Sequence, residues 1–119
     1  MRSMKAVLIV APLALAALPQ PVAAHHGWSG YDATQLVTLA GTVQSIAYAS
    51  PHVLLVLEAD GKLWEIVLAP PSRMQRRGLP DGAIRTGEPV TVEGYPHRSD
   101  PDEFRAERIG LNGQSFELR

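Results

Sequence analysis

Three of the four histidines in this 119-residue chain have the residue type and spacing to bind a metal ion. His25 and His26 are adjacent, and His52 follows Pro51. Imidazole is the commonest metal-ligand side chain and suits copper, zinc and nickel. A histidine at the first position of a processed chain would also offer its α-amine, so that the amine and one ring nitrogen chelate a single ion. We therefore predict a metal site that consists of His25, His26 and His52.

The first 24 residues have the pattern of an export signal, which decides where the mature chain begins. A short basic region with Arg2 and Lys5 precedes an apolar stretch, and Val22 and Ala24 are the small residues expected just before cleavage. The apolar stretch is shorter than the roughly 20 residues that span a bilayer. We predict that residues 1–24 are a cleaved signal peptide, that the protein is periplasmic or secreted, and that no membrane span remains. An uncleaved membrane anchor is the alternative.

The cleavage position determines which metal donors are available. Cleavage after Ala24 would make His25 the first residue, and its amine and ring nitrogen with one nitrogen of His52 would form a T-shaped, nitrogen-only site. Cleavage after Ala23 would place His26 third, and the amine, two backbone amides and the imidazole would offer a square-planar Cu(II) or Ni(II) site. Both arrangements favour copper through the Irving–Williams order. The alternative is a solvated N-terminal pair and a His52 that hydrogen-bonds the backbone.

Composition describes the mature chain as one acidic domain without cysteine. Removal of the signal takes away Arg2 and Lys5, which lowers Lys plus Arg from 11 to nine against 12 Asp plus Glu, a net charge of about −3. This balance lacks the basic footprint of a nucleic-acid binder, and the absence of cysteine excludes disulfides and thiolate ligands. The chain contains no nucleophile elbow, phosphate-binding loop or zinc-protease helix pattern. We therefore predict no enzyme activity and no nucleic-acid partner.

The elements that must position the histidines are mostly β-strands. Period-2 alternation of apolar residues is a strand signal, and Asp60-Gly61 and Asn112-Gly113 are strong signals for two-residue hairpins. A phase shift in the first strand, with Gly41 inside it, predicts a bend or bulge. Strands are expected at 36–48, 52–58, 62–68, 89–95, 104–111 and 114–118, with a helix at 73–77.

This order of elements predicts an all-β fold with little helix. We expect an N-terminal segment at 25–35 and, at 36–119, a five- to six-stranded OB-like Greek-key barrel whose short helix lies between the third and fourth strands. An open β-sandwich is the structural alternative.

Aromatic residues offer a second kind of site. Trp64 alternates out of phase with Leu63 and Val67, which predicts that its ring lies on the outer sheet face, where OB barrels often bind ligands. Trp28 and Tyr31 can dock the N-terminal segment, and either one could cover Trp64. A non-catalytic ligand- or protein-interaction module that uses these three aromatic residues is the alternative to a metal-binding protein. An accessory subunit of an envelope redox or transport system, with an envelope protein as partner, is a third hypothesis.

Arginines are concentrated on the expected helix. Arg73 and Arg77 share a face at i, i+4, with Arg76 and Met74 between them, and such a face could bind an acidic partner or an anionic ligand. We favour a solvated face whose Met74 covers one end of the barrel. Charged residues of the fifth expected strand, Arg105 among them, are interpreted as edge charges that discourage association between sheets.

Several short motifs together resemble a known family. They are Ala24-His25-His26, Pro51-His52-Val53, Arg76-Arg77-Gly78 and Gly94-Tyr95-Pro96, in this order. The combination resembles a family of short exported bacterial proteins classed as domain of unknown function 6152, over essentially the whole mature chain. The resemblance implies a bacterial cell-envelope protein and carries no established reaction. The paired histidines and the Pro-His pair belong to the pattern, whereas His97 does not.

Overall fold

The computed structural model describes residues 27–119, so the predicted signal peptide, His25 and His26 lie outside the described residues. The elements follow one another in the predicted order. They are β1 (Val37–Ala47), β2 (Leu54–Ala59), β3 (Lys62–Val67), α1 (Pro71–Arg76), β4 (Pro89–Pro96), β5 (Glu103–Leu111) and β6 (Gln114–Glu117). Among these residues no helix has the length and hydrophobicity that a membrane span requires.

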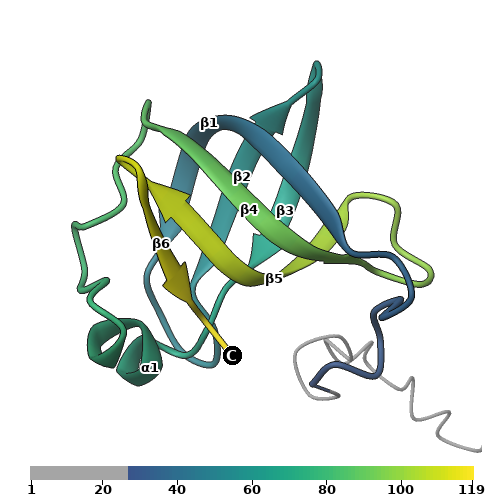
Figure 1. Cartoon of the computed structure of the whole chain (residues 1–119), viewed down its shortest axis with the longest axis horizontal. Helices are drawn as coiled ribbons and strands as arrows, with labels where there is room; N and C mark the ends of the chain where they lie inside the picture. The colour runs from purple at the N-terminus through teal and green to yellow at the C-terminus, as the bar shows by residue number, and fades with distance from the viewer. Residues whose placement is uncertain (1–26) are drawn as a thin grey trace, which may run out of the picture.

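Five strands close into a barrel, and β6 extends it (Figure 1). β1 pairs antiparallel with both β2 and β4, β2 pairs with β3, and β4 pairs with β5. A parallel ladder between β3 and β5 completes the ring, and β6 pairs with the second half of β5. The short helix lies between β3 and β4. The predicted OB-like Greek-key barrel is therefore confirmed.

Two tight turns fix the register of their hairpins. Asp60 and Gly61 have φ values of 54° and 73°, and Asn112 and Gly113 have values of 52° and 76°. Positive φ at both central residues is the requirement of a type I′ turn, which Asp-Gly and Asn-Gly satisfy at low steric cost. The two-residue loops set Ala59 opposite Lys62 and Leu111 opposite Gln114.

The barrel core consists of the inward-facing residues of all five strands. Leu55, Leu57, Ile66, Phe104 and Ile109 have no exposed surface. Full burial of a large apolar side chain contributes roughly 1.5–3 kcal/mol, so these residues dominate the stability of the barrel. As predicted, the helix supplies a fully buried methionine that packs into this core at one end of the barrel.

Two glycines let neighbouring strands approach closely. A Cβ atom at Gly41 would collide with the carbonyl group of Glu58, and one at Gly94 would collide with that of Arg105. The predicted bulge in β1 exists, but its register shift lies beyond Gly41, between Val43 and Ser45. A strand that lacks side chains at such points can cross its neighbour at short range, as barrel closure requires.

We expect Gly94→Ala to lower the free energy of unfolding by about 1–3 kcal/mol or more, since the added methyl group must push two paired strands apart. Gly110→Ala is the matched control, because its Cβ would meet the Thr91 Cβ at 3.6 Å, an ordinary contact. Urea denaturation followed by circular dichroism measures both. Equal destabilisation by the two variants would contradict this account of Gly94.

Candidate binding site around Arg105

The N-terminal segment is held on the barrel by aromatic contacts. Tyr31 is 1 % exposed and forms an isolated β-bridge with His97, in the loop between β4 and β5. The Trp28 ring makes edge contacts with Tyr31 and Tyr95, at centroid distances of 6.5 and 5.9 Å. Figure 1 shows the described part of this segment beside the start of β1 and the β4–β5 loop. Trp28 and Tyr31 therefore dock the segment, as their types suggest.

A buried arginine lies beneath this segment. Arg105 faces outward from β5 but is only 5 % exposed. Its Nη1 donates to the carbonyl oxygen of Gly27 at 3.1 Å, and its Nη2 lies 3.3 Å from His52 Nε2. The guanidinium carbon lies 4.5 Å from the centroid of the Trp28 ring, a cation–π distance. The interpretation of Arg105 as an exposed edge charge is therefore wrong, because the N-terminal segment covers this part of the strand.

The positive charge of Arg105 is not neutralised by a direct ion pair. Within residues 27–119 no carboxylate forms a salt bridge with it. Arg105 Nε and His52 Nδ1 are buried and have no hydrogen-bond partner in this part of the chain. Burial is the main cause that lowers the pKa of Arg105; the positive charges of Arg73 and Arg119 lower it further, whereas Tyr31 and Glu103 raise it. A buried, incompletely satisfied cation is costly, so this site is a candidate for function.

His52 acts as the hydrogen-bond acceptor of Arg105. A guanidinium group can only donate, so the facing Nε2 accepts and the neutral ring carries its proton on Nδ1. Burial lowers the pKa of His52, and the charges of Arg105 and Arg73 lower it further. Ligation of a metal through Nε2 would require Arg105 to turn away. No group of three His, Cys, Asp or Glu residues in the described chain is placed to hold a metal ion.

A hydrogen-bonded acid lies on the same strand face. The Tyr31 hydroxyl donates to Glu103 Oε2 at 2.7 Å, and burial followed by this bond raises the pKa of Tyr31. His97 Nε2 lies 3.6 Å from the same carboxylate oxygen, while its Nδ1 accepts from the backbone N–H groups of Ser99 and Asp100. His97 therefore stabilises the β4–β5 loop and the docked segment.

Trp64 does not lie on the outer sheet face, so that prediction is wrong. The Asp-Gly turn places Trp64 opposite Leu57, which points into the core. Its ring packs edge-on against Phe104 at 6.1 Å, and Lys62 Nζ lies 3.8 Å from the ring centroid. The outward positions belong to Leu63 and its alternating neighbours. The N-terminal aromatic residues pack against the β4 and β5 side instead of covering Trp64.

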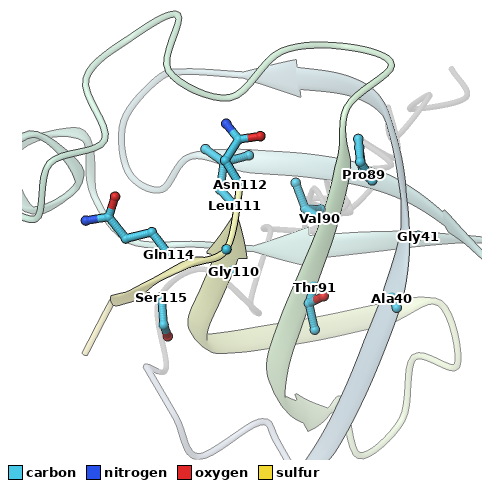
Figure 2. Close-up of a pocket in the computed structure, with 11 residues that line it drawn as sticks. Ala40, Gly41, Pro89, Val90, Thr91, Gly110, Leu111, Asn112, Gln114 and Ser115 are labelled. Atoms are coloured by element: carbon cyan, nitrogen blue, oxygen red, sulfur yellow. The ribbon is translucent and has the colours of Figure 1, made fainter.

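Two hollows on the barrel surface lack histidine and arginine. Figure 2 shows the first, of about 460 Å³, across β1, β4 and the β5–β6 hairpin. Its lining contains no titratable side chain, and the residues are Ala40, Gly41, Pro89, Val90, Thr91, Gly110, Leu111, Asn112, Gly113, Gln114 and Ser115. The second, of about 490 Å³, lies along β1–β3, and the lining residues are Ser45, Ile46, Ala47, Leu54, Val56, Leu63, Trp64, Glu65 and Asp102. The second hollow therefore contains two carboxylates, Glu65 and Asp102, and burial raises the pKa of Glu65.

The lowered pKa of His52 has a testable consequence for acid stability. The unfolded chain takes up a proton on His52 at the usual pKa of 6.5, whereas burial in the folded chain opposes protonation. The stability that the neutral ring contributes is therefore complete above that pH and is lost as the pH falls below it. We expect His52→Gln, which keeps an acceptor for Arg105, to lose less stability than the wild type between about pH 7.5 and 5. Urea denaturation across this range measures the free energy of unfolding. An equally steep fall with pH in both proteins would contradict the lowered pKa of His52.

Comparison with known proteins gives a family and a fold. A model described as a family of unknown function, DUF6152, matches residues 13–104, and this is the family that the sequence motifs resemble. No curated protein matches the chain.

Solved structures of TiaS share the barrel. A ZRD-deleted mutant in complex with agmatine is 18% identical with a TM-score of 0.54, and covers 71% of this chain and 26% of that one. A complex of TiaS with tRNA, AMPCPP and agmatine is 19% identical with a TM-score of 0.50, over 65% of this chain and 18% of that one. A complex of TiaS with tRNA and ATP is 19% identical with a TM-score of 0.51, over 71% and 19%. This chain thus spans about a quarter or less of those proteins, and the similarity concerns the fold.

Proposed function

Because the chain belongs to the DUF6152 family of unknown function, we propose a function from its own residues. It is an exported, non-catalytic binding protein of the bacterial cell envelope. Its β-barrel presents the N-terminal histidines, His25 and His26, which hold one transition-metal ion, with copper as the first candidate.

The position of Gly27 carries this proposal. Its carbonyl oxygen accepts a hydrogen bond from Arg105, and Arg105 also contacts His52. Gly27, the first residue that the structure describes, therefore lies at the His52 end of the barrel, and His25 and His26 directly precede it in the sequence. The docked Trp28 ring restrains the chain next to them. A restrained segment loses less conformational entropy when it chelates an ion.

Electrostatic repulsion decides which donors the ion uses. A divalent ion about 6 Å from a guanidinium group is repelled by about 5–6 kcal/mol at an effective dielectric constant of about 20, and Arg105 contacts His52 directly. We therefore assign the ion to the α-amine and the imidazoles of His25 and His26. His52 remains the acceptor of Arg105.

The test combines intact mass spectrometry of the mature protein from its native envelope with Cu(II) and Zn(II) calorimetry. We expect a chain that starts at His25 and binds one Cu(II) ion more tightly than about micromolar, which corresponds to about −8 kcal/mol. A three-glycine extension before His25 should weaken binding at least about tenfold, since it separates the amine from both imidazoles. Shorter extensions are unsuitable because they place a histidine third and create the square-planar amine–amide site.

His52→Ala is the control in this experiment, and its copper affinity should stay within about threefold of the wild type if the N-terminal donors suffice. A strong loss of copper affinity in that variant would show that His52 is a metal ligand. A mature mass that starts elsewhere, or binding weaker than micromolar, would overturn the metal proposal.

The surface outside β2 and β3 favours a second candidate function, a protein-interaction module. Leu54 and Leu63 are 36% and 58% exposed, and they flank Val56 beside the second hollow. A contiguous exposed apolar patch is a recognised feature of interaction sites. An envelope partner, such as a redox or transport complex, would bury these leucines.

For this second candidate, Leu63→Asp should abolish cross-linking to an envelope partner while the barrel still unfolds cooperatively. Leu36→Asp is a matched control, because Leu36 is 57% exposed and lies outside this hollow. Cross-linking in native envelopes followed by mass spectrometry compares the two variants. A partner that survives Leu63→Asp would rule out this surface.

A further inference from the structure

Two guanidinium groups contact the Trp28 ring, and a third, from α1, contacts the C-terminal residues. The guanidinium carbons of Arg105 and Arg119 lie 4.5 and 4.7 Å from the centroid of Trp28. Arg73 Nη1 donates at 3.5 Å to the carbonyl oxygen of Leu118, the residue before Arg119. Figure 1 shows α1 and the C-terminal residues at the same end of the barrel. We call Arg73, Arg105 and Arg119 the arginine cluster.

Carboxylates balance the arginine cluster only in part. Glu107 pairs with Arg119 at 3.4 Å, and it is the one acidic side chain within residues 27–119 that forms a salt bridge with any member. Elsewhere on the barrel, Arg85 pairs with Glu88, and Arg108 pairs with both Glu93 and Glu117. The cluster is therefore a concentrated positive region on a chain whose formal net charge is −1.

The buried member of the cluster also has unused donor capacity. A guanidinium group carries five N–H donors in a planar fork, and the contacts of Arg105 to Gly27 and His52 engage Nη1 and Nη2. Its Nε–H is buried, with no acceptor in the part of the chain that the structure describes. Fixing the N-terminal segment explains the contact with Gly27, and the contact with His52 orients the side chain. Neither explains the unpaired Nε–H group or the nearby guanidinium groups of Arg73 and Arg119.

We propose that the arginine cluster binds the oxyanion group, carboxylate or phosphate, of a small anionic ligand. Guanidinium forks match such oxygens in bidentate geometry. Arg119 is exposed and Arg73 is partly so, so the ligand binds these two guanidinium groups from solvent, while the buried Arg105 adds positive charge beneath the N-terminal segment. His52 keeps Arg105 oriented through its Nε2 acceptor. The inference does not depend on a bound metal ion.

The ring of Trp28 is a reporter for this site. Trp28 and Trp64 are the two tryptophans of the chain, so a Trp64→Phe background isolates the fluorescence of Trp28. The mature, chelator-treated protein is titrated with citrate and with inorganic phosphate, each against sodium chloride of equal ionic strength. Calorimetry on the chain with native Trp64 repeats the titration without the background substitution. We expect a saturable response to at least one oxyanion and none to chloride.

Variants decide whether the cluster is responsible. Arg73→Gln and Arg119→Gln should each weaken binding about tenfold, because each removes one charge-assisted donor set. Arg76→Gln is the matched control: it is an exposed arginine on the same helix, and its affinity should stay within about twofold. Binding of citrate alone assigns a carboxylate ligand, and binding of phosphate alone assigns a phosphate ligand. An absent or chloride-like response, or equal weakening by Arg76→Gln, overturns the proposal.

The glycine-extended chain separates this proposal from the metal proposal. Anion binding that persists when copper binding is lost shows that the arginine cluster acts by itself. Anion binding that disappears together with copper binding would contradict the inference, because no metal donor belongs to the cluster.

Discussion

Burial of the Arg105 guanidinium connects parts of the chain that are far apart in sequence. One nitrogen binds a carbonyl group 78 residues earlier, and another meets a histidine 53 residues earlier. Each contact depends on barrel closure, because the parallel β3–β5 ladder and the antiparallel β4–β5 ladder hold the strand that carries Arg105. In return, the arginine gives the N-terminal segment a fixed place on the barrel surface. The barrel and the described part of its N-terminal segment are thus one structural unit.

Much of the fold could be predicted because its signals are local. Asp60-Gly61 and Asn112-Gly113 carry their turn type in two residues, and strand alternation shows over short windows. The face of β3 was harder to assign, since Leu63 and Trp64 are both apolar and β2 is apolar at nearly every position. The pairing of Trp64 with Leu57, a core residue, resolves the face of β3. The sequence alone does not show which face of β2 is buried. A one-residue difference in phase reverses the assignment.

The candidate site could be predicted only in part, because its chemistry comes from long-range contacts. His52 was identified by residue type, but its electrostatic environment is set by Arg105 and Arg73, which lie on other elements. Arg105 alternates like an ordinary outward-facing charge, and no local pattern shows that Trp28 covers it. The basic face of α1 was visible as a spacing of arginines. Its relation to Trp28 and the C-terminal residues emerges only when the barrel brings them together.

The division of the β5 edge between two partners has a consequence for proteolysis. β3 pairs with β5 from Glu103 to Arg105, and β6 pairs with it from Arg108 to Leu111. Loss of β6 by trimming would leave the second stretch with unpaired backbone groups, while the ring of five strands stayed closed. An exposed strand edge of this kind is a template for pairing with another chain. The four residues of β6 therefore cover this stretch of β5 and leave a shorter strand edge, their own, at the end of the sheet.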